Sequence, residues 1–236
     1  MTTIIDGHVF LGKTIYMEQT GETLIANMDR LGVDISVVVA PPPGPFYGEA
    51  NAYVLEAVKK YPGRLAALFR ANPQLEGEED RFRDALGRGF SGVQLDSTND
   101  GYGVGSDRME PVVKVAEEEE VPVYIRSGDS IFCPPEAVAD YASKFREVNF
   151  VTSQSRRAFR AVKGCGNIYI TTRPFPTLAF QRGFADELDL DRIIFTSDAP
   201  LGNLDLEMRS VELSRLEDEK RERILGGNLR RILQIT

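Results

Sequence analysis

Ile4-Ile5-Asp6-Gly7-His8-Val9-Phe10-Leu11-Gly12 is the stretch that decides the fold. It is an apolar run close to the N-terminus, and it carries an aspartate and the only histidine of the 236 residues. Polar residues at the end of a buried strand are typical of barrel enzymes, in which strand ends carry the chemistry. The stretch therefore predicts a first strand that delivers His8 to a functional site.

Short β-branched runs alternate with helical patterns along the rest of the chain. The patterns predict strands at 3–7, 35–40, 65–69, 92–95, 122–125, 149–152, 168–171 and 192–195. They predict helices near 22–31, 50–60, 78–87, 108–119, 135–145, 156–162 and 176–188, with closing helices from about 205 to 232. The strands are continuous Val/Ile/Leu runs, as a parallel sheet covered by helices requires.

Eight strands, each followed by a helix, predict a single-domain α/β (β/α)8 TIM barrel over residues 1–236. A doubly wound open sheet is the alternative, but its first turn carries a glycine-rich phosphate-binding loop. We do not expect residues 7–13 to form such a loop. The proline-rich piece at 41–45 should form a rigid loop at the top face of the barrel.

The overall charge and the cysteines indicate the class of partner and the compartment. A net charge of −8 and a pI near 4.9 argue against nucleic acid and anionic membranes as partners. Cys133 and Cys165 show no metal-binding or redox spacing, which favours a reducing cytoplasm. With an early first strand and no apolar run of about 20 residues, we expect a cytoplasmic protein with a small-molecule substrate.

Polar side chains gather where the predicted strands end, and the carboxyl ends of barrel strands share one face. The charged members of this set are Arg70, Arg126, Arg156, Arg173, Asp6, Asp96, Asp129 and Asp198. The partly cationic face predicts a pocket for a small organic acid. We predict that the substrate contacts Arg70, Gln94, Asp96, Gln154, Arg173 and Tyr124.

Four segments resemble the amidohydrolase-2 branch of the amidohydrolase superfamily, the group of aminocarboxymuconate-semialdehyde decarboxylase. They are residues 5–12 (Asp-x-His-x-His-x-Gly in the family), 89–96, 192–200 (Arg-Ile-x-Phe-x-Ser-Asp-x-Pro) and 219–233. The resemblance spans essentially the whole chain. It implies a TIM-barrel hydrolase or decarboxylase acting on a small carboxylated molecule, with a possible homodimer.

The sequence departs from the family at the metal ligands that the resemblance implies. Phe10, Arg126 and Gln154 or a neighbour stand where the family places histidines, so only His8 and Asp198 remain. A catalytic zinc normally takes three protein ligands. We therefore expect no cofactor; zinc or another divalent metal on His8 and Asp198, helped by Gln154 or Asp96, is the alternative.

The altered site suggests chemistry without a metal. Strands one and eight are neighbours in a closed barrel, so His8 and Asp198 should form an acid–base pair. Arg126 would replace the charge of the metal, either by pairing with Asp198 or by holding a substrate carboxylate. Two further interpretations stay open: an inactive barrel that only binds a ligand, and a histidine that only anchors its strand.

Overall fold

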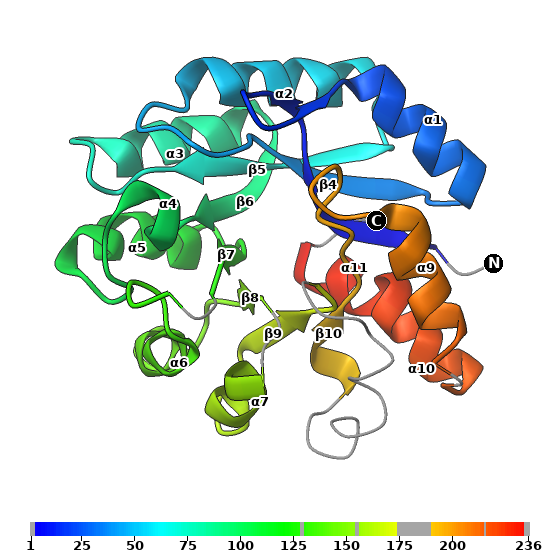
Figure 1. Cartoon of the computed structure of the whole chain (residues 1–236). Helices are drawn as coiled ribbons and strands as arrows, with labels where there is room; N and C mark the ends of the chain where they lie inside the picture. The colour runs from blue at the N-terminus through cyan, green and yellow to red at the C-terminus, as the bar shows by residue number, and fades with distance from the viewer. Residues whose placement is uncertain (1–2, 128–129, 154–155, 174–189, 215, 234–236) are drawn as a thin grey trace.

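Eight parallel strands surround one axis in a computed structural model that describes residues 3–127, 130–153, 156–173, 190–214 and 216–233 (Figure 1). Their order around the axis is their order along the chain. They are β1 (Ile5–Phe10), β4 (Ile35–Val39), β5 (Leu65–Ala71), β6 (Phe90–Leu95), β7 (Val123–Ile125), β8 (Phe150–Thr152), β9 (Ile168–Thr171) and β10 (Ile193–Ile194). Consecutive strands are therefore neighbours, as in a barrel wound in one direction.

Backbone hydrogen bonds between β1 and the segment after β10 close the barrel. The amide of Gly7 donates to Phe195 O at 2.9 Å, and the amide of Phe10 donates to Ala199 O at 2.8 Å. In the opposite direction, the amide of Asp198 donates to His8 O at 3.0 Å. The prediction of a single-domain (β/α)8 barrel is confirmed.

Helices follow the strands and cover the outside of the barrel (Figure 1). They are α1 (Gly21–Leu31), α2 (Gly48–Lys60), α3 (Glu78–Arg88), α4 (Ser97–Asp100), α5 (Glu110–Glu118), α6 (Pro135–Ala142), α7 (Arg156–Val162), α9 (Leu204–Glu212), α10 (Asp218–Glu222) and α11 (Asn228–Leu233). The predicted helix at 176–188 lies outside the described residues. No helix in the described part of the chain is long and apolar enough to cross a membrane.

Two apolar layers hold the barrel together. The inner layer takes side chains from seven of the eight strands and from α11: Ile5, Phe10, Val37, Val39, Leu68, Tyr124, Val151, Tyr169, Ile194, Leu229, Ile232 and Leu233. The outer layer lies between strands and helices. Because both faces of each strand are buried, the strands are apolar along their whole length, which explains the pattern in the sequence.

Residues 7–14 match a phosphate-binding motif in sequence but not in structure. They are Gly-His-Val-Phe-Leu-Gly-Lys-Thr, which does match the spacing of a phosphate-binding loop. The structure makes the match coincidental, because Gly7 to Phe10 continue β1, and Lys13 pairs with Glu18 in a hairpin of β2 (Gly12–Lys13) and β3 (Glu18–Gln19). Gly7 instead allows close packing, since a Cβ there would lie 2.7 Å from Ile194 Cγ2.

Candidate active site

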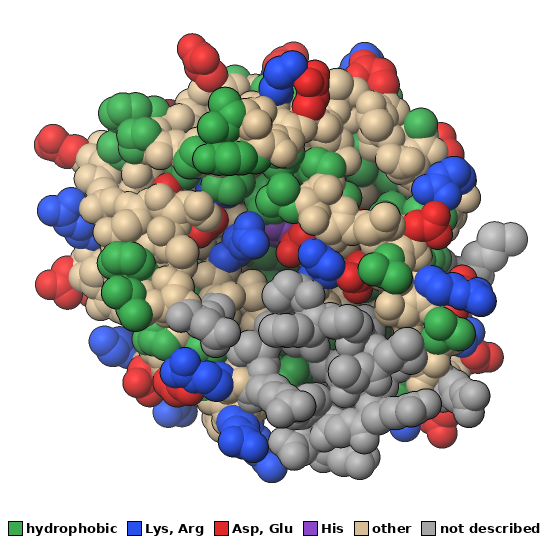
Figure 2. Space-filling view, in the orientation of Figure 1, with side chains coloured by type: hydrophobic (Ala, Val, Ile, Leu, Met, Phe, Trp, Pro, Cys, Tyr) green, Lys and Arg blue, Asp and Glu red, His purple; other side chains and the backbone are tan. Residues whose placement is uncertain are grey.

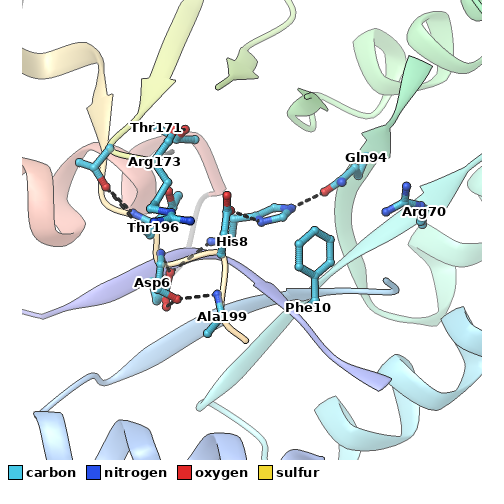
Figure 3. Close-up of polar contacts among 12 residues, drawn as sticks. Asp6, His8, Phe10, Arg70, Gln94, Thr171, Arg173, Thr196 and Ala199 are labelled. Atoms are coloured by element: carbon cyan, nitrogen blue, oxygen red, sulfur yellow. Dashed lines mark hydrogen bonds and ion pairs between the residues drawn. The ribbon is translucent and has the colours of Figure 1, made fainter. Parts of the chain in front are cut away.

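His8 lies near the end of β1 with its imidazole inside the barrel, 4 % exposed. Its Nδ1 lies 2.7 Å from Asp198 Oδ1, and its Nε2 lies 2.6 Å from Gln94 Oε1 (Figure 3). Both ring nitrogens thus face oxygen acceptors. The ring is therefore held at both ends, by a carboxylate on one side and an amide on the other.

Asp198 follows β10 and meets β1 through both its backbone and its side chain. Its φ of +53° is in the left-handed region, which aspartate tolerates better than most residues and which often marks functional positions. Burial raises the pKa of Asp198, but the charge and hydrogen bond of His8, followed by the charges of Arg126 and Arg173, outweigh this effect and lower the pKa below its ordinary value. The carboxylate is therefore ionised at neutral pH.

Arg126 follows β7 and brings a half-buried positive charge to the same place. Its guanidinium lies over the ring of Phe10, with Cζ 5.4 Å from the ring centroid. The same ring meets His8 edge-on at 4.8 Å. Among the described residues the guanidinium has no hydrogen-bond or ion-pair partner, because Asp198 pairs with His8 instead. Arg126 is thus available to an anion.

These side chains line a small cavity at the carboxyl ends of the strands. His8, Gln94, Tyr124, Arg126, Thr171 and Asp198 all contribute to its wall. The cavity is small: the volume available to the centre of a water-sized sphere is about 20 Å³. Figure 2 shows the histidine at the base of a hollow, flanked by basic and acidic side chains. The cavity therefore admits one small polar group next to His8.

The remaining candidates have other partners. Arg70 and Asp96 form an ion pair, Nη2 to Oδ2 at 2.7 Å, with both side chains at most 1 % exposed. Arg173 reaches Glu207 Oε1 at 3.3 Å. None of these residues lines the cavity. Gln154, Asp129 and the side chain of Arg156 lie outside the described residues.

Three further residues belong to the site, although the sequence did not single out their roles. Phe10 supports both Arg126 and His8, and Thr171 at the end of β9 lines the cavity. The Asp6 carboxylate accepts from the amide and hydroxyl of Ser197 at 2.8 and 2.5 Å, and so fastens β1 to the last strand. Burial raises the pKa of Asp6 to about 7. Sequence reasoning could have found Thr171, because it stands at the end of a predicted strand.

The buried ion pair predicts a large effect on stability. We expect Arg70→Met to lower the free energy of unfolding by about 3–5 kcal/mol, because Asp96 then stays buried without its cation. Urea unfolding followed by circular dichroism measures the change. The matched control is Arg83→Met, which breaks two exposed pairs with Glu118 and Glu119 and should change little. Equal effects of the two substitutions would contradict the structural role of Arg70.

The donor set does not fit the divalent metal that the family resemblance implies. His8 directs one nitrogen at Asp198 and the other at Gln94, and the ring of Phe10 lies where a second imidazole would ligate. The cation of Arg126 acts on Asp198 as well. Within the described ranges, no group of three or more His, Cys, Asp or Glu side chains could hold a metal ion. A catalytic zinc normally requires three protein ligands.

A family model identifies the family of the chain, and solved structures share its fold. The amidohydrolase family model matches residues 21–235, while the curated proteins gave no significant sequence match.

Among solved structures, 5-carboxyvanillate decarboxylase from Sphingomonas paucimobilis has a TM-score of 0.78 at 15 % identity, with 100 % of both chains covered. The same decarboxylase from Novosphingobium aromaticivorans, complexed with manganese and 4-hydroxy-3-methoxy-5-nitrobenzoic acid, has a TM-score of 0.81 at 15 % identity, covering 99 % of this chain and 96 % of that one. The 2,6-dihydroxybenzoate decarboxylase from Rhizobium has a TM-score of 0.76 at 15 % identity, covering 100 % of this chain and 99 % of that one. At these identities the likeness to solved structures concerns the fold.

Proposed function

Because the chain belongs to the amidohydrolase family, we propose that it is an enzyme that decarboxylates or hydrolyses a small carboxylated molecule without a metal. His8 and Asp198 act as the acid–base pair, and Arg126 binds the substrate carboxylate. The observation that carries this proposal is the guanidinium of Arg126, which has no anionic partner among the described residues and lines the same cavity as the His8–Asp198 pair. Aromatic acids are the first class to try, since the similar structures are decarboxylases of such acids.

Arg126 supplies the binding energy for the carboxylate. A guanidinium donates two parallel hydrogen bonds to a carboxylate, and its planar face is stabilised here by the ring of Phe10. The half-buried position reduces competition from water, so the ion pair should be stronger than one at the surface. The substrate is thereby held beside the imidazole.

The two reactions need His8 in opposite protonation states. In decarboxylation the bond to the leaving carboxylate breaks, its electron pair stays on the substrate carbon, and that carbon takes a proton from the imidazolium. In hydrolysis the neutral imidazole instead removes a proton from water. The carboxylate of Asp198 at Nδ1 would stabilise the positively charged ring that decarboxylation needs as its proton donor, and this supports decarboxylation over hydrolysis. Asp198 fixes the ring and stabilises its positive charge.

A substrate screen tests the proposal. Purified protein is incubated with benzoic acids that carry hydroxyl or methoxy groups, and the release of carbon dioxide is measured. Matching lactones and amides are followed for hydrolysis. We expect turnover in the acid set. Binding of acids without any turnover would favour the alternative of an inactive ligand-binding barrel, and no binding at all would refute the role of Arg126.

Chelation is expected to leave the activity unchanged, because neither binding nor proton transfer requires a metal here. The protein is dialysed against EDTA, its metal content is measured by elemental analysis, and turnover is compared before and after addition of Mn²⁺ or Zn²⁺. Mn²⁺ is included because one of the similar structures contains manganese. Stoichiometric metal together with activity that returns only on adding it back would contradict the proposal and favour a site on His8 and Asp198.

A further inference from the structure

Two buried donors on residues that line the cavity have no role in the chemistry described above. They are the amide nitrogen Nε2 of Gln94 and the hydroxyl of Tyr124, on residues that are 0 % and 3 % exposed. Within the described part of the chain, neither atom has a hydrogen-bond partner. Buried donors are nearly always satisfied, so donors that line a cavity indicate a group that enters it.

The register of the sheet places the two side chains next to each other. Gln94 on β6 pairs with Tyr124 on β7, and neighbouring strands lie about 4.8 Å apart. The Oε1 atom of Gln94 faces His8 Nε2 at 2.6 Å, which leaves Nε2 as the free end of the amide. The ring of Tyr124 lies 6.3 Å from the His8 ring and nearly parallel to it, at 23°. Both side chains therefore lie beside the imidazole.

The chemistry of the pair selects the group that it binds. An amide nitrogen only donates, and a phenol can donate at the same time, so one oxygen with two lone pairs satisfies both. The cavity fits a single group of the size of a water molecule, so only the end of a larger ligand enters it. A carbonyl oxygen meets both conditions, whereas a methylene group in its place would leave two buried donors unsatisfied.

We propose that Gln94 and Tyr124 form a two-donor site for a carbonyl oxygen of the substrate, separate from the carboxylate site at Arg126. The substrate class is then an oxo acid, in which Arg126 holds the carboxylate and the donor pair holds the carbonyl oxygen. This inference rests on the proposed function, because it takes Arg126 as the carboxylate site. Gln94 also links the two sites, since its amide contacts His8 with one end and the bound oxygen with the other.

Binding of two matched acids tests the inference without knowledge of the natural substrate. Phenylglyoxylate and phenylacetate differ in one position, which is a carbonyl in the first and a methylene in the second. Dissociation constants are measured by calorimetry for the wild type, for Tyr124→Phe and for the control Tyr102→Phe. Tyr102 is also a buried tyrosine, but it does not line the cavity.

We expect the wild type and Tyr102→Phe to bind phenylglyoxylate about 10- to 100-fold more tightly than phenylacetate. In Tyr124→Phe this preference should fall several-fold, while the affinity for phenylacetate stays the same. Equal affinities in the wild type would overturn the inference and assign the donors to an ordered water; the proposed function would stand, because both acids still bind. If Tyr124→Phe kept the full preference for phenylglyoxylate over phenylacetate, the inference would also be overturned. If neither acid binds, the carboxylate site at Arg126 fails, and the inference fails with it.

Discussion

His8→Asn is expected to lower the turnover number by about 10²- to 10⁴-fold, the usual contribution of a general acid or base. Asparagine retains a polar side chain but cannot transfer a proton at neutral pH. The carboxylate of the substrate still meets Arg126, so the Michaelis constant should change far less than kcat. Steady-state kinetics at saturating substrate, corrected for the folded fraction from thermal melting, measures the effect.

Asp198→Asn completes the experiment as the second half of a double-mutant cycle. The two side chains share a hydrogen bond of 2.7 Å, so the double variant should lose about as much as either single one. Additive losses would show that the two residues act independently. A His8→Asn variant with full turnover but lower stability would mean that the imidazole only anchors β1 to the barrel.

Arg126→Met is expected to weaken the binding of a substrate acid by about 10- to 100-fold, the value of hydrogen bonds to a charged group. Methionine fills a similar volume over the ring of Phe10 but carries no charge. The amide of the same acid serves as a neutral probe, and its affinity should not change. The wild type should therefore prefer the acid to its amide, and the variant should not.

Two further variants sharpen the result for Arg126. Arg126→Lys keeps the charge but loses the planar fork, so it should restore only part of the affinity. Arg83→Met removes an exposed arginine on α3 and should not affect binding. If Arg126→Met bound the acid as tightly as the wild type, the carboxylate would have to bind elsewhere in the barrel. The most useful readout is the ratio of acid to amide affinity, because a general loss of folding would lower both.

The fold could be predicted because the signals for it are local. Eight apolar runs of strand length, separated by helical patterns, are sufficient for a barrel, and the observed strands lie at the predicted places. The predicted strands differ from the observed ones only at their first and last residues. The first strand was predicted to end at Gly7 but continues to Phe10, because Asp6 and His8 are satisfied by Ser197, Asp198 and Gln94 inside the barrel. Those partners are far apart in the sequence.

Short elements were missed for a physical reason. The hairpin of β2 and β3 has two residues in each strand, and α4 has four residues, so neither shows a hydrophobic period. The closing helical region from 205 to 232 is three helices with a π-helical turn at Arg223–Gly227. A break of this kind depends on how the turn packs against β1 and β10, which a single sequence does not reveal.

The candidate site was only partly predictable. The rule that strand ends meet at one face selected His8, Gln94, Tyr124, Arg126 and Asp198, which line one cavity. The same rule could not predict which charged side chains form ion pairs with each other. Arg70 and Asp96 satisfy each other in the wall of the barrel, and Asp198 takes His8 rather than Arg126. The choice of partner depends on strand register and on distances of a few ångströms, neither of which follows from residue type.

The stacking of Arg126 on Phe10 couples positions 10 and 126. By resemblance, both positions carry histidine in related enzymes, and here the two side chains support each other. A histidine at position 10 alone would face the cation of Arg126, which repels a divalent ion. A histidine at position 126 alone would remove the anion site and leave the ring of Phe10 among the ligands. A change at either position therefore removes the contact that the other side chain depends on, so positions 10 and 126 are expected to tolerate substitution only as a pair.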